Sequence, residues 1–359
     1  MKEYKIAAIP GDGIGKEVLP EGIKVLQAAA EKTGAFRLAV DEYPWGCGHY
    51  LEAGVVMPED GIDILSNYDA VYFGASGHPQ VPDYLSAWRL IFVIRHAFDQ
   101  YINLRPIKLF PGVTTPLANV APEDIDFVIV RENTEGEFAG PGGQVHAGHP
   151  HAVAVQTSVF TRQGVEQVAR YAFELAQERR GHVTNITKSN AVQHSLVFWD
   201  QVIKEVSQDY PDVGYELLYV DAAVMKFIQE PRRFDVIVTT NLFGDILSDL
   251  GAAMMGSIGI AASGNINPDT SRPSMFEPFH GSAPDIAGQG VANPAGAIWA
   301  GAMMLDHLGE RDAAQLILGA MAQVLETGPR TPDLGGSATT VQMGDAVAGL
   351  VVSRKLVES

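Results

Sequence analysis

Residues 5–18, KIAAIPGDGIGKEV, decide how the N-terminal part of the chain folds. The apolar run from Tyr4 to Ile9 has the length and composition of a β-strand. A glycine-rich turn follows, and the apolar spacing of the next residues, VLPEGIKVLQAAAEK, predicts an amphipathic helix. The turn lacks the spacing G-x-G-x-x-G and an acidic partner at the usual distance, which excludes a standard Rossmann fingerprint. We therefore expect a strand, a turn and a helix without that nucleotide motif.

The alternation of strand and helix continues along the chain. Short apolar runs at 70–75, 127–132, 182–188 and 234–241 predict strands, and each lies next to a helical pattern. The clearest helices are expected at 161–179, where Thr161 can cap the first turn, and from Asp245 to about Met255. Alternating strands and helices imply an α/β protein with a largely parallel sheet.

Residues 140–155 interrupt this pattern. The segment is rich in glycine and proline, so we expect a protruding loop or arm. Its histidines, His146, His149 and His151, could be metal ligands, but exposed histidines of this kind are more often solvated loop residues.

Length, composition and charge limit the classes of function. The chain has 359 residues, of which 46% are apolar and 19% charged, enough for a sizeable core and consistent with two lobes. A formal charge of −18 argues against nucleic acid and anionic membranes as partners, since both bind through excess lysine and arginine.

The sequence also predicts a cytoplasmic location. An apolar stretch at 292–305 contains Pro294 and several glycines and falls short of a bilayer span. The first residues lead into a short strand instead of the long apolar region of a signal peptide. Cys47 is the single cysteine, so no internal disulfide can form, which agrees with a reducing compartment.

Asp245 and Asp249, in the segment NLFGDILSDLG, stand four residues apart and so share one face of a helix. Two like charges there cost stability unless a cation neutralises them, and Mg²⁺ and Mn²⁺ prefer oxygen ligands. A solvated acidic face is the alternative, but apolar neighbours on both sides favour a metal site.

Arg95, Arg105 and Arg131 are concentrated in a short part of an acidic chain. Guanidinium groups bind carboxylates through paired hydrogen bonds, so a substrate with two carboxylates would use several of them. Each could also be a surface residue, and their meaning depends on whether they converge.

Lys188 lies in the segment TKSN at the end of a predicted strand. A lysine can carry a proton only if burial or neighbouring positive charge lowers its pKa toward neutrality. An ordinary strand-end lysine is the simpler interpretation of this segment alone.

Residues 277–296, EPFHGSAPDIAGQGVANPAG, combine small residues with few strongly polar ones. Small residues let the backbone approach a nucleotide, and an acidic side chain can hold both ribose hydroxyls while repelling a 2′-phosphate. This pattern favours NAD over NADP. The predicted cofactor-binding residues are His280, Gly281, Ser282, Ala283, Asp285 and Asn293.

Six segments occur in this order: IPGDGIGKEV, FDQYINLRP, VRENTEGEF, TKSNA, NLFGDILSDL and MFEPFHGSAPDIAG. Together they resemble the β-hydroxyacid oxidative decarboxylase family, which contains the isopropylmalate, isocitrate, D-malate and tartrate dehydrogenases. The resemblance covers nearly the whole chain and is closest to tartrate dehydrogenase and D-malate dehydrogenase (decarboxylating). It implies an α/β, isopropylmalate dehydrogenase-like fold in which two lobes share a large mixed sheet, not a classical Rossmann fold.

The resemblance also implies how the lobes divide. Residues 1–100 and 254–359 would form the first lobe and bind NAD. Residues 101–253 would form the second lobe, with substrate and metal residues, the dimer interface and an arm at about 138–157. The family is a homodimer with shared active sites, so each site would draw Lys188 and Asp221 from the neighbouring subunit.

By the same resemblance, the three arginines bind the substrate's carboxylates, and the metal, Mg²⁺ or Mn²⁺, is ligated by Asp221, Asp245 and Asp249. Lys188 and Asp221 would be the catalytic residues, with Lys188 accepting the proton of the 2-hydroxyl. The implied activity is NAD-dependent oxidation, with possible decarboxylation, of a small 2-hydroxy diacid such as D-malate or tartrate.

Trp88 lies seven residues before Arg95, which is similar to the D-malate and tartrate branch of the family. A bulky indole there leaves less room for an isopropyl group on the substrate. Two alternatives stay open. One is an isopropylmalate or isocitrate dehydrogenase with a divergent pocket, and the other is a catalytically silent subunit that binds NAD or a metabolite. Retention of Lys188 and the three aspartates weighs against the silent subunit.

Phe138 departs from the family pattern in VRENTEGEF. The family carries a tyrosine here, which is thought to protonate the enolate after carbon dioxide leaves, and phenylalanine has no proton to give. Either water or another acid replaces it, or Phe138 is an engineered change. The other interpretation is that the enzyme stops after oxidation or takes an unusual substrate.

Overall fold

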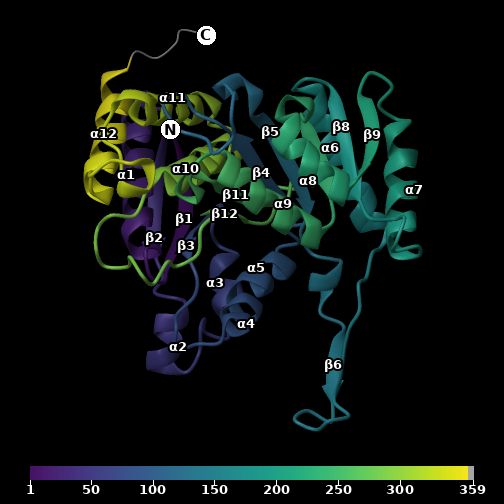
Figure 1. The fold of residues 1–359 in the computed structure, drawn as a ribbon. Coiled ribbons are helices and arrows are strands. Elements are labelled where there is room, and N and C mark those ends of the chain that lie inside the picture. Colours follow the sequence, from purple (N-terminus) through teal and green to yellow (C-terminus); the bar gives the residue numbers. More distant parts are fainter. Residues whose placement is uncertain (355–359) are drawn as a thin grey trace. The chain divides into compact units, whose positions relative to one another are not determined.

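The structure is a computed structural model that describes residues 1–354, and it divides into two compact units (Figure 1). Unit 1 comprises residues 1–100, 108–122 and 252 onward, and unit 2 comprises residues 101–107 and 123–251. The sequence prediction placed residues 108–122 in the second lobe, whereas they pack within unit 1. There the ring of Phe110 lies 5.1 Å from the ring of Trp299, centroid to centroid.

Unit 1 is built on strands in the order β2-β1-β3-β12-β11. The parallel pairs join β1 (Lys2–Gly11), β2 (Phe36–Glu42), β3 (Ala70–Ala75) and β12 (Ser274–Pro278), whereas β11 (Ala262–Ile266) runs antiparallel to β12. From Ile6 onward every residue of β1 is buried, as expected for a central strand with both faces covered. The predicted α/β class with a mixed sheet is confirmed.

The helices of unit 1 surround this sheet. They are α1 (Gly15–Thr33), α2 (Cys47–Ala53), α3 (Gly61–Leu65), α4 (Asp83–Ser86), α5 (Phe92–Ala97), α10 (Ala295–His307), α11 (Arg311–Thr327) and α12 (Thr340–Ser353). A π-helical turn (Ala87–Ile91) joins α4 to α5. No helix within residues 1–354 is both long enough and apolar enough to cross a membrane.

The glycine turn between β1 and α1 is fixed by Asp12. Its buried carboxylate accepts hydrogen bonds of 2.8–3.1 Å from three backbone N–H groups, those of Cys47, Gly48 and Gly77. Gly13 has a φ of 52°, and a Cβ there would lie 2.0 Å from the carbonyl oxygen of Ser282. Glycine is therefore required at this position, where the turn touches the loop after β12.

Unit 2 contains strands in the order β4-β5-β10-β8-β9. They are β4 (Ile102–Lys108), β5 (Asp126–Glu132), β10 (Val236–Thr239), β8 (His182–Thr187) and β9 (Gly214–Tyr219). Because β5, β10, β8 and β9 pair in parallel, their carboxyl ends lie along one edge. A core cluster of aromatic rings, with centroids 4.7–5.8 Å apart, joins Phe127, Phe227 and Phe234.

Four helices belong wholly or mainly to unit 2: α6 (Arg162–Gln177), α7 (Ser195–Ser207), α8 (Val220–Gln229) and α9 (Asn241–Met254). The predicted cap of α6 is confirmed, since the side chain of Thr161 accepts a hydrogen bond from the N–H of Gly164. The sequence predicts that α9 starts at Asp245, but it begins one turn earlier. Asparagine and glycine are weak helix formers, yet the N–H of Gly244 bonds to the carbonyl of Thr240.

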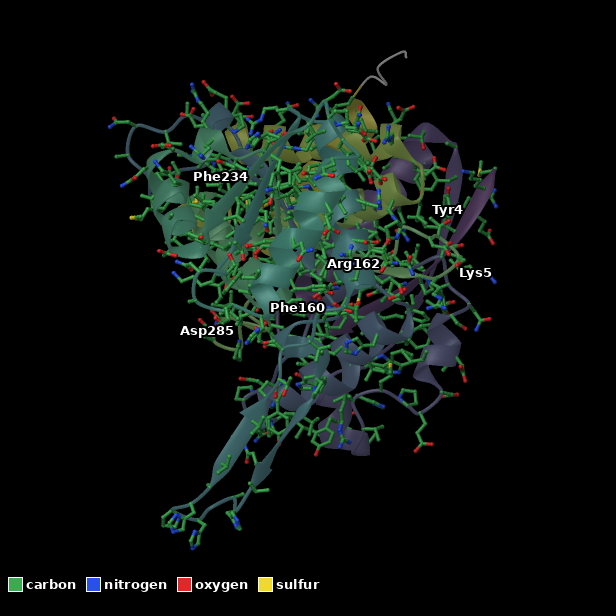
Figure 2. All side chains as sticks on the ribbon, turned by 90° about the vertical axis from the view of Figure 1, so that its right-hand side faces the viewer. Tyr4, Lys5, Phe160, Arg162, Phe234 and Asp285 are labelled. Carbon is green, nitrogen blue, oxygen red and sulfur yellow. The ribbon has the colours of Figure 1, made fainter. Side chains whose placement is uncertain are left out.

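Residues 140–155 form a β-hairpin. In it β6 (Gly142–Val145) pairs antiparallel with β7 (Val153–Gln156), and every residue of both strands is exposed. The hairpin projects from unit 2 (Figures 1 and 2). Its tip carries the three histidines, His146, His149 and His151, with neighbouring ring centroids 6.3 and 5.1 Å apart.

Glu132, the last residue of β5, is a fully buried acid whose carboxylate accepts hydrogen bonds from the backbone N–H groups of Thr134 and Glu135. Burial raises the pKa of Glu132 to about 7, and these hydrogen bonds oppose the rise only in part. Between pH 4.5 and about 7 the folded chain therefore keeps a proton that the unfolded chain releases. The stability gained from this proton is fully present below pH 4.5 and is lost as the pH rises to about 7.

We predict that Glu132→Gln flattens the pH dependence of stability, because the variant has no titrating group at position 132. The wild-type free energy of unfolding should fall, relative to the variant, by on the order of 1–3 kcal/mol across this pH window. Urea denaturation at a series of pH values measures the difference. Glu52→Gln, at an exposed position of α2, is the control. Parallel curves for wild type and Glu132→Gln would contradict the prediction.

Candidate active site

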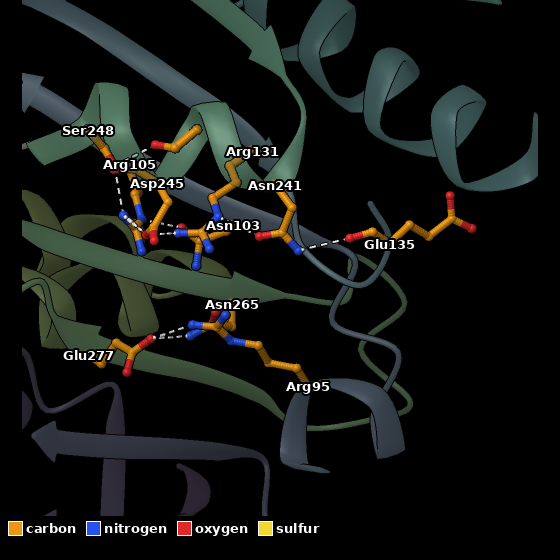
Figure 3. Close-up of polar contacts among 11 residues, drawn as sticks. Arg95, Asn103, Arg105, Arg131, Glu135, Asn241, Asp245, Ser248, Asn265 and Glu277 are labelled. Atoms are coloured by element: carbon orange, nitrogen blue, oxygen red, sulfur yellow. Dashed lines mark hydrogen bonds and ion pairs between the residues drawn. The ribbon is translucent and has the colours of Figure 1, made fainter. Parts of the chain in front are cut away.

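Arg105 of β4 and Arg131 of β5 meet at one carboxylate, that of Asp245 on α9 (Figure 3). β4 and β5 are neighbours, and α9 follows β10, the strand on the other side of β5. The arginine side chains are 8% and 3% exposed, whereas the side chain of Asp245 is 46% exposed. The structure thus brings together three predicted site residues from distant parts of the chain.

Uncharged groups orient each guanidinium. Nε of Arg105 donates to Oδ1 of Asn103 at 2.5 Å, and its Nη1 donates to Oγ of Ser248 at 2.6 Å. Nε of Arg131 donates to Oδ1 of Asn241 at 2.9 Å. The sequence prediction missed all three partners, because a buried asparagine or serine carries no pattern that distinguishes it from a turn or cap residue.

Asp249 stands one turn after Asp245 on α9. Loss of hydration raises the pKa of Asp249 above its usual value, the charge of Asp245 adds to the rise, and the two arginines oppose it. A divalent cation would relieve the repulsion between the two carboxylates. Their oxygens fit Mg²⁺ or Mn²⁺, which favour carboxylate ligands.

Lys188 and Asp221 form a second pair in unit 2. They follow the last residues of β8 and β9, which are paired in the sheet, and Nζ of Lys188 lies 2.5 Å from Oδ1 of Asp221. Lys188 holds the pKa of Asp221 below its usual value. The adjacent parallel strands therefore explain why two residues 33 positions apart come together.

The described part of one chain does not form a complete metal site. Among residues 1–354, no three His, Cys, Asp or Glu side chains gather closely enough to hold a metal ion. Asp245 and Asp249 supply two of the predicted ligands, and Asp221 of the same chain is bound to Lys188. Since the sequence prediction takes the third ligand from a neighbouring subunit, the donor set would need a second chain.

Arg95, on α5 of unit 1, is the third predicted arginine and is also buried (Figure 3). Its Nη2 donates to Oε1 of Glu277 at 3.3 Å, and Nδ2 of Asn265 donates to the same oxygen at 2.7 Å. Its Nε is buried with no hydrogen-bond partner among the described residues. A buried donor without an acceptor costs free energy, so this N–H fits an anionic ligand.

Trp88 is connected to Arg95 through Phe92. The rings of Trp88 and Phe92 pack edge to face with centroids 4.9 Å apart, and the guanidinium of Arg95 lies 5.5 Å from the centroid of Phe92. Trp88 is 37% exposed, so part of this residue is open to solvent. The sequence prediction singled out Trp88 and missed Phe92, which lies one turn from each of the other two.

The predicted cofactor loop follows β12 in unit 1. Nδ1 of the buried His280 lies 2.9 Å from the carbonyl oxygen of Gly281, while its Nε2 has no partner among the described residues. Since a carbonyl only accepts, Nδ1 carries the proton and Nε2 is an acceptor; burial lowers the pKa of His280 and keeps the ring neutral. This orphaned acceptor fits a ligand that donates N–H or O–H, as a nucleotide does. Ser282 is buried against the glycine turn, and Ala283 has a φ of 40°.

Two residues outside this loop hold it in place. Glu17 of α1 accepts hydrogen bonds from two of its backbone N–H groups, and Asp333 accepts one from Asn293 at 2.9 Å. Asp333 also lines a cavity of about 230 Å³. Asp285 itself is exposed on the surface (Figure 2). The sequence prediction named Asn293 and Asp285 but not Glu17 or Asp333, which lie far from this loop in the sequence.

Comparison with known proteins decides the family. Residues 5–347 match the family model described as isocitrate/isopropylmalate dehydrogenase. The chain belongs to this family. The D-malate dehydrogenase (decarboxylating) of Escherichia coli strain K12 is 53% identical, with 98% of this chain and 99% of that protein covered.

Two further relatives agree with this family. The tartrate dehydrogenase/decarboxylase of Pseudomonas putida is 49% identical, with 96% of this chain and 97% of that protein covered. Among solved structures, the isocitrate dehydrogenase from Methylococcus capsulatus matches with a TM-score of 0.88 and 37% identity, covering 98% of this chain and 100% of that chain. The predicted resemblance and the isopropylmalate dehydrogenase-like fold are confirmed.

Phe138, the position that departs from the family pattern, borders the arginine pair. Its ring centroid lies 5.7 Å from the guanidinium carbon of Arg131. The hydroxyl expected from the family resemblance is therefore missing beside a residue of the candidate site, and not at a remote position.

We predict that Asp245→Asn and Asp249→Asn each reduce metal-dependent turnover by at least about 100-fold. Each removes an anionic ligand, and changes to outer-shell partners alone already cost roughly 10–100-fold. Turnover and Mn²⁺ affinity across a metal titration measure the effect, with thermal melting as a check of folding. Asp312→Asn, at an exposed position of α11, is the control. Unchanged turnover and Mn²⁺ affinity in either variant would refute the ligand assignment.

Proposed function

We propose that this chain is an oxidoreductase that oxidises a small 2-hydroxy diacid such as D-malate or tartrate, with NAD and Mg²⁺ or Mn²⁺ and with possible decarboxylation. The observation that carries the proposal is the carboxylate of Asp245, shared by the buried Arg105 and Arg131 and one turn from Asp249. A guanidinium pair that holds one carboxylate has the geometry to hold another. The printed names of the D-malate and tartrate relatives support a diacid substrate.

The proposed roles divide between carboxylate binding, metal binding and proton transfer. The substrate's two carboxylates are bound by Arg95, Arg105 and Arg131, and the cation by Asp245, Asp249 and the partner subunit's Asp221. When bound, the cation lowers the pKa of the 2-hydroxyl and NAD accepts the hydride. The partner subunit's Lys188 takes the hydroxyl proton. Trp88 borders the substrate on the side of Arg95 and disfavours a branched side chain.

The proposed nucleotide site is the loop after β12. His280, through its unpartnered Nε2, is an acceptor for the nucleotide, and the small residues Gly281, Ser282 and Ala283 let the backbone approach it. Asn293 closes the far end of the loop against Asp333. The exposed carboxylate of Asp285 holds the ribose hydroxyls and repels a 2′-phosphate, so the enzyme uses NAD.

We also propose a homodimer with shared active sites. Several apolar side chains are exposed on α8 and on the hairpin, namely Val224, Met225, Ile228, Val145, Val153 and Val155. Clusters of exposed apolar side chains favour an interface. Because Asp221 lies on α8, a contact through this helix would supply the third metal ligand to a neighbouring chain. A cytoplasmic location agrees with the buried, free thiol of Cys47.

A substrate panel tests the proposed activity. We predict NADH formation from D-malate or a tartrate with Mn²⁺, none in EDTA, and at least about tenfold lower kcat/KM with isopropylmalate and isocitrate. NADH and carbon dioxide are measured together, and Lys188→Met should lose about 10²–10⁴ in rate. Activity confined to isopropylmalate or isocitrate would replace the proposal with the divergent-pocket alternative. No NADH from any of these acids would favour a silent subunit.

Phe138→Tyr tests whether the missing hydroxyl limits a late step. We predict that the variant releases the decarboxylated product faster in a single turnover, by up to about 10²–10⁴, because general acids contribute rate on this scale. NADH formation and substrate affinity should change little. Phe138→Leu, which changes the ring without adding a hydroxyl, is the matched control. If Phe138→Tyr alters neither step, another group already supplies the proton.

A further inference from the structure

Two groups compete for the carboxylate of Asp245: the arginine pair in the structure and the cation in the proposed function. In the structure its carboxylate accepts hydrogen bonds from Nη1 of Arg105 and Nη1 of Arg131. In the proposed function, on which this inference rests, the same carboxylate binds the cation while the same two guanidinium groups bind the diacid. Both arginines donate from Nη1 to one atom, Oδ1 of Asp245, so a diacid carboxylate that takes these two N–H groups must displace that oxygen.

Charge explains why Asp245 takes the first arrangement when no cation is bound. The two guanidinium groups are buried, and their Nε atoms are oriented by neutral amides, those of Asn103 and Asn241. Neutral acceptors orient a guanidinium without compensating its charge, and a buried cation is costly without an anion nearby. The carboxylate of Asp245 supplies that negative charge.

Asp245 is the most exposed member of this group of three charged side chains. Its side chain is 46% exposed, against 8% and 3% for those of Arg105 and Arg131. The carboxylate therefore reaches solvent while the guanidinium groups stay fixed by Asn103, Ser248 and Asn241. A rotation of one aspartate side chain would leave both arginines oriented for a new anion.

We propose that Asp245 is an internal stand-in for a substrate carboxylate, which closes the Arg105–Arg131 anion site until a divalent cation draws it away. Without the cation, a diacid must displace Asp245 before it can bind. With the cation, Asp245 becomes a ligand and the two arginines accept the diacid. Binding of cation and diacid is thereby coupled, and by thermodynamic linkage each strengthens the other equally.

Metal-free binding separates this proposal from a simple ligand role. The proposal predicts that removal of Asp245 tightens binding of the diacid, whereas a simple ligand role predicts no change without the cation. D-malate is titrated by calorimetry in EDTA into full-length wild type, Asp245→Asn and Asp249→Asn. If Asp245 occupies the arginines for about 90% of the time, its removal tightens metal-free binding by about tenfold. Asp249→Asn is the matched control, because it removes an equal charge one turn along α9. Within residues 1–354 the side chain of Asp249 makes no hydrogen bond to these arginines. Asp245→Ala is measured as well, since an asparagine can still accept a hydrogen bond from a guanidinium.

The outcomes separate this inference from the proposed function. Tighter metal-free binding in Asp245→Ala or Asp245→Asn, and not in Asp249→Asn, supports the stand-in. The stand-in is overturned if neither Asp245 variant binds D-malate in EDTA more tightly than wild type does. The proposed function stays intact in that case, provided that wild type binds D-malate with Mg²⁺. Equal tightening in Asp249→Asn also overturns the stand-in, since general charge would then be the cause. Wild type that binds neither D-malate nor tartrate with Mg²⁺ overturns the proposed function, and this inference with it.

Discussion

Two buried guanidinium groups need an anion nearby, and this constraint determines how the candidate site is arranged. Arg105 and Arg131 lie on neighbouring strands, with little of either side chain exposed. α9 brings Asp245 to them, and a Cβ on Gly244 would lie 2.7 Å from Cβ of Arg131, so glycine allows this close approach. In the segment NLFGD, Asn241 orients the guanidinium of Arg131 and Gly244 makes room for its side chain. Asp245, in the same segment, balances its charge.

The remaining chemistry is placed by the strand ends. In unit 2, β8 and β9 end in register, which puts Lys188 and Asp221 within hydrogen-bonding distance. In unit 1, β12 leads into the cofactor loop, which contacts the glycine turn at Ser282 and is held further along by Glu17. Each unit therefore builds its own part of the chemistry on a rigid set of strands, as expected of α/β proteins that bind ligands at the carboxyl ends of their strands.

Local features could be predicted from the sequence, whereas supports that depend on distant pairing could not. The cap at Thr161 and the strands around residues 70–75 and 127–132 follow from short-range patterns, and the structure has them. The aspartates and arginines were recognised by residue type and spacing. Their direct pairing was not foreseen, because residues 105 and 245 are 140 positions apart and meet only once the strands have assembled. Asn103 and Ser248 were missed for the same reason.

The central claim is that one carboxylate, that of Asp245, alternates between the arginine pair and a divalent cation. The most direct measurement is a pair of crystal structures, one grown in EDTA and one with Mg²⁺ and D-malate. In the structure grown in EDTA, we predict that the carboxylate of Asp245 is hydrogen-bonded to Arg105 and Arg131. In the second we predict an oxygen of Asp245 at about 2.0–2.1 Å from Mg²⁺ and a carboxylate of D-malate on the two arginines. Asp245 still bound to both arginines in the second structure, with Mg²⁺ and D-malate present, would contradict the claim.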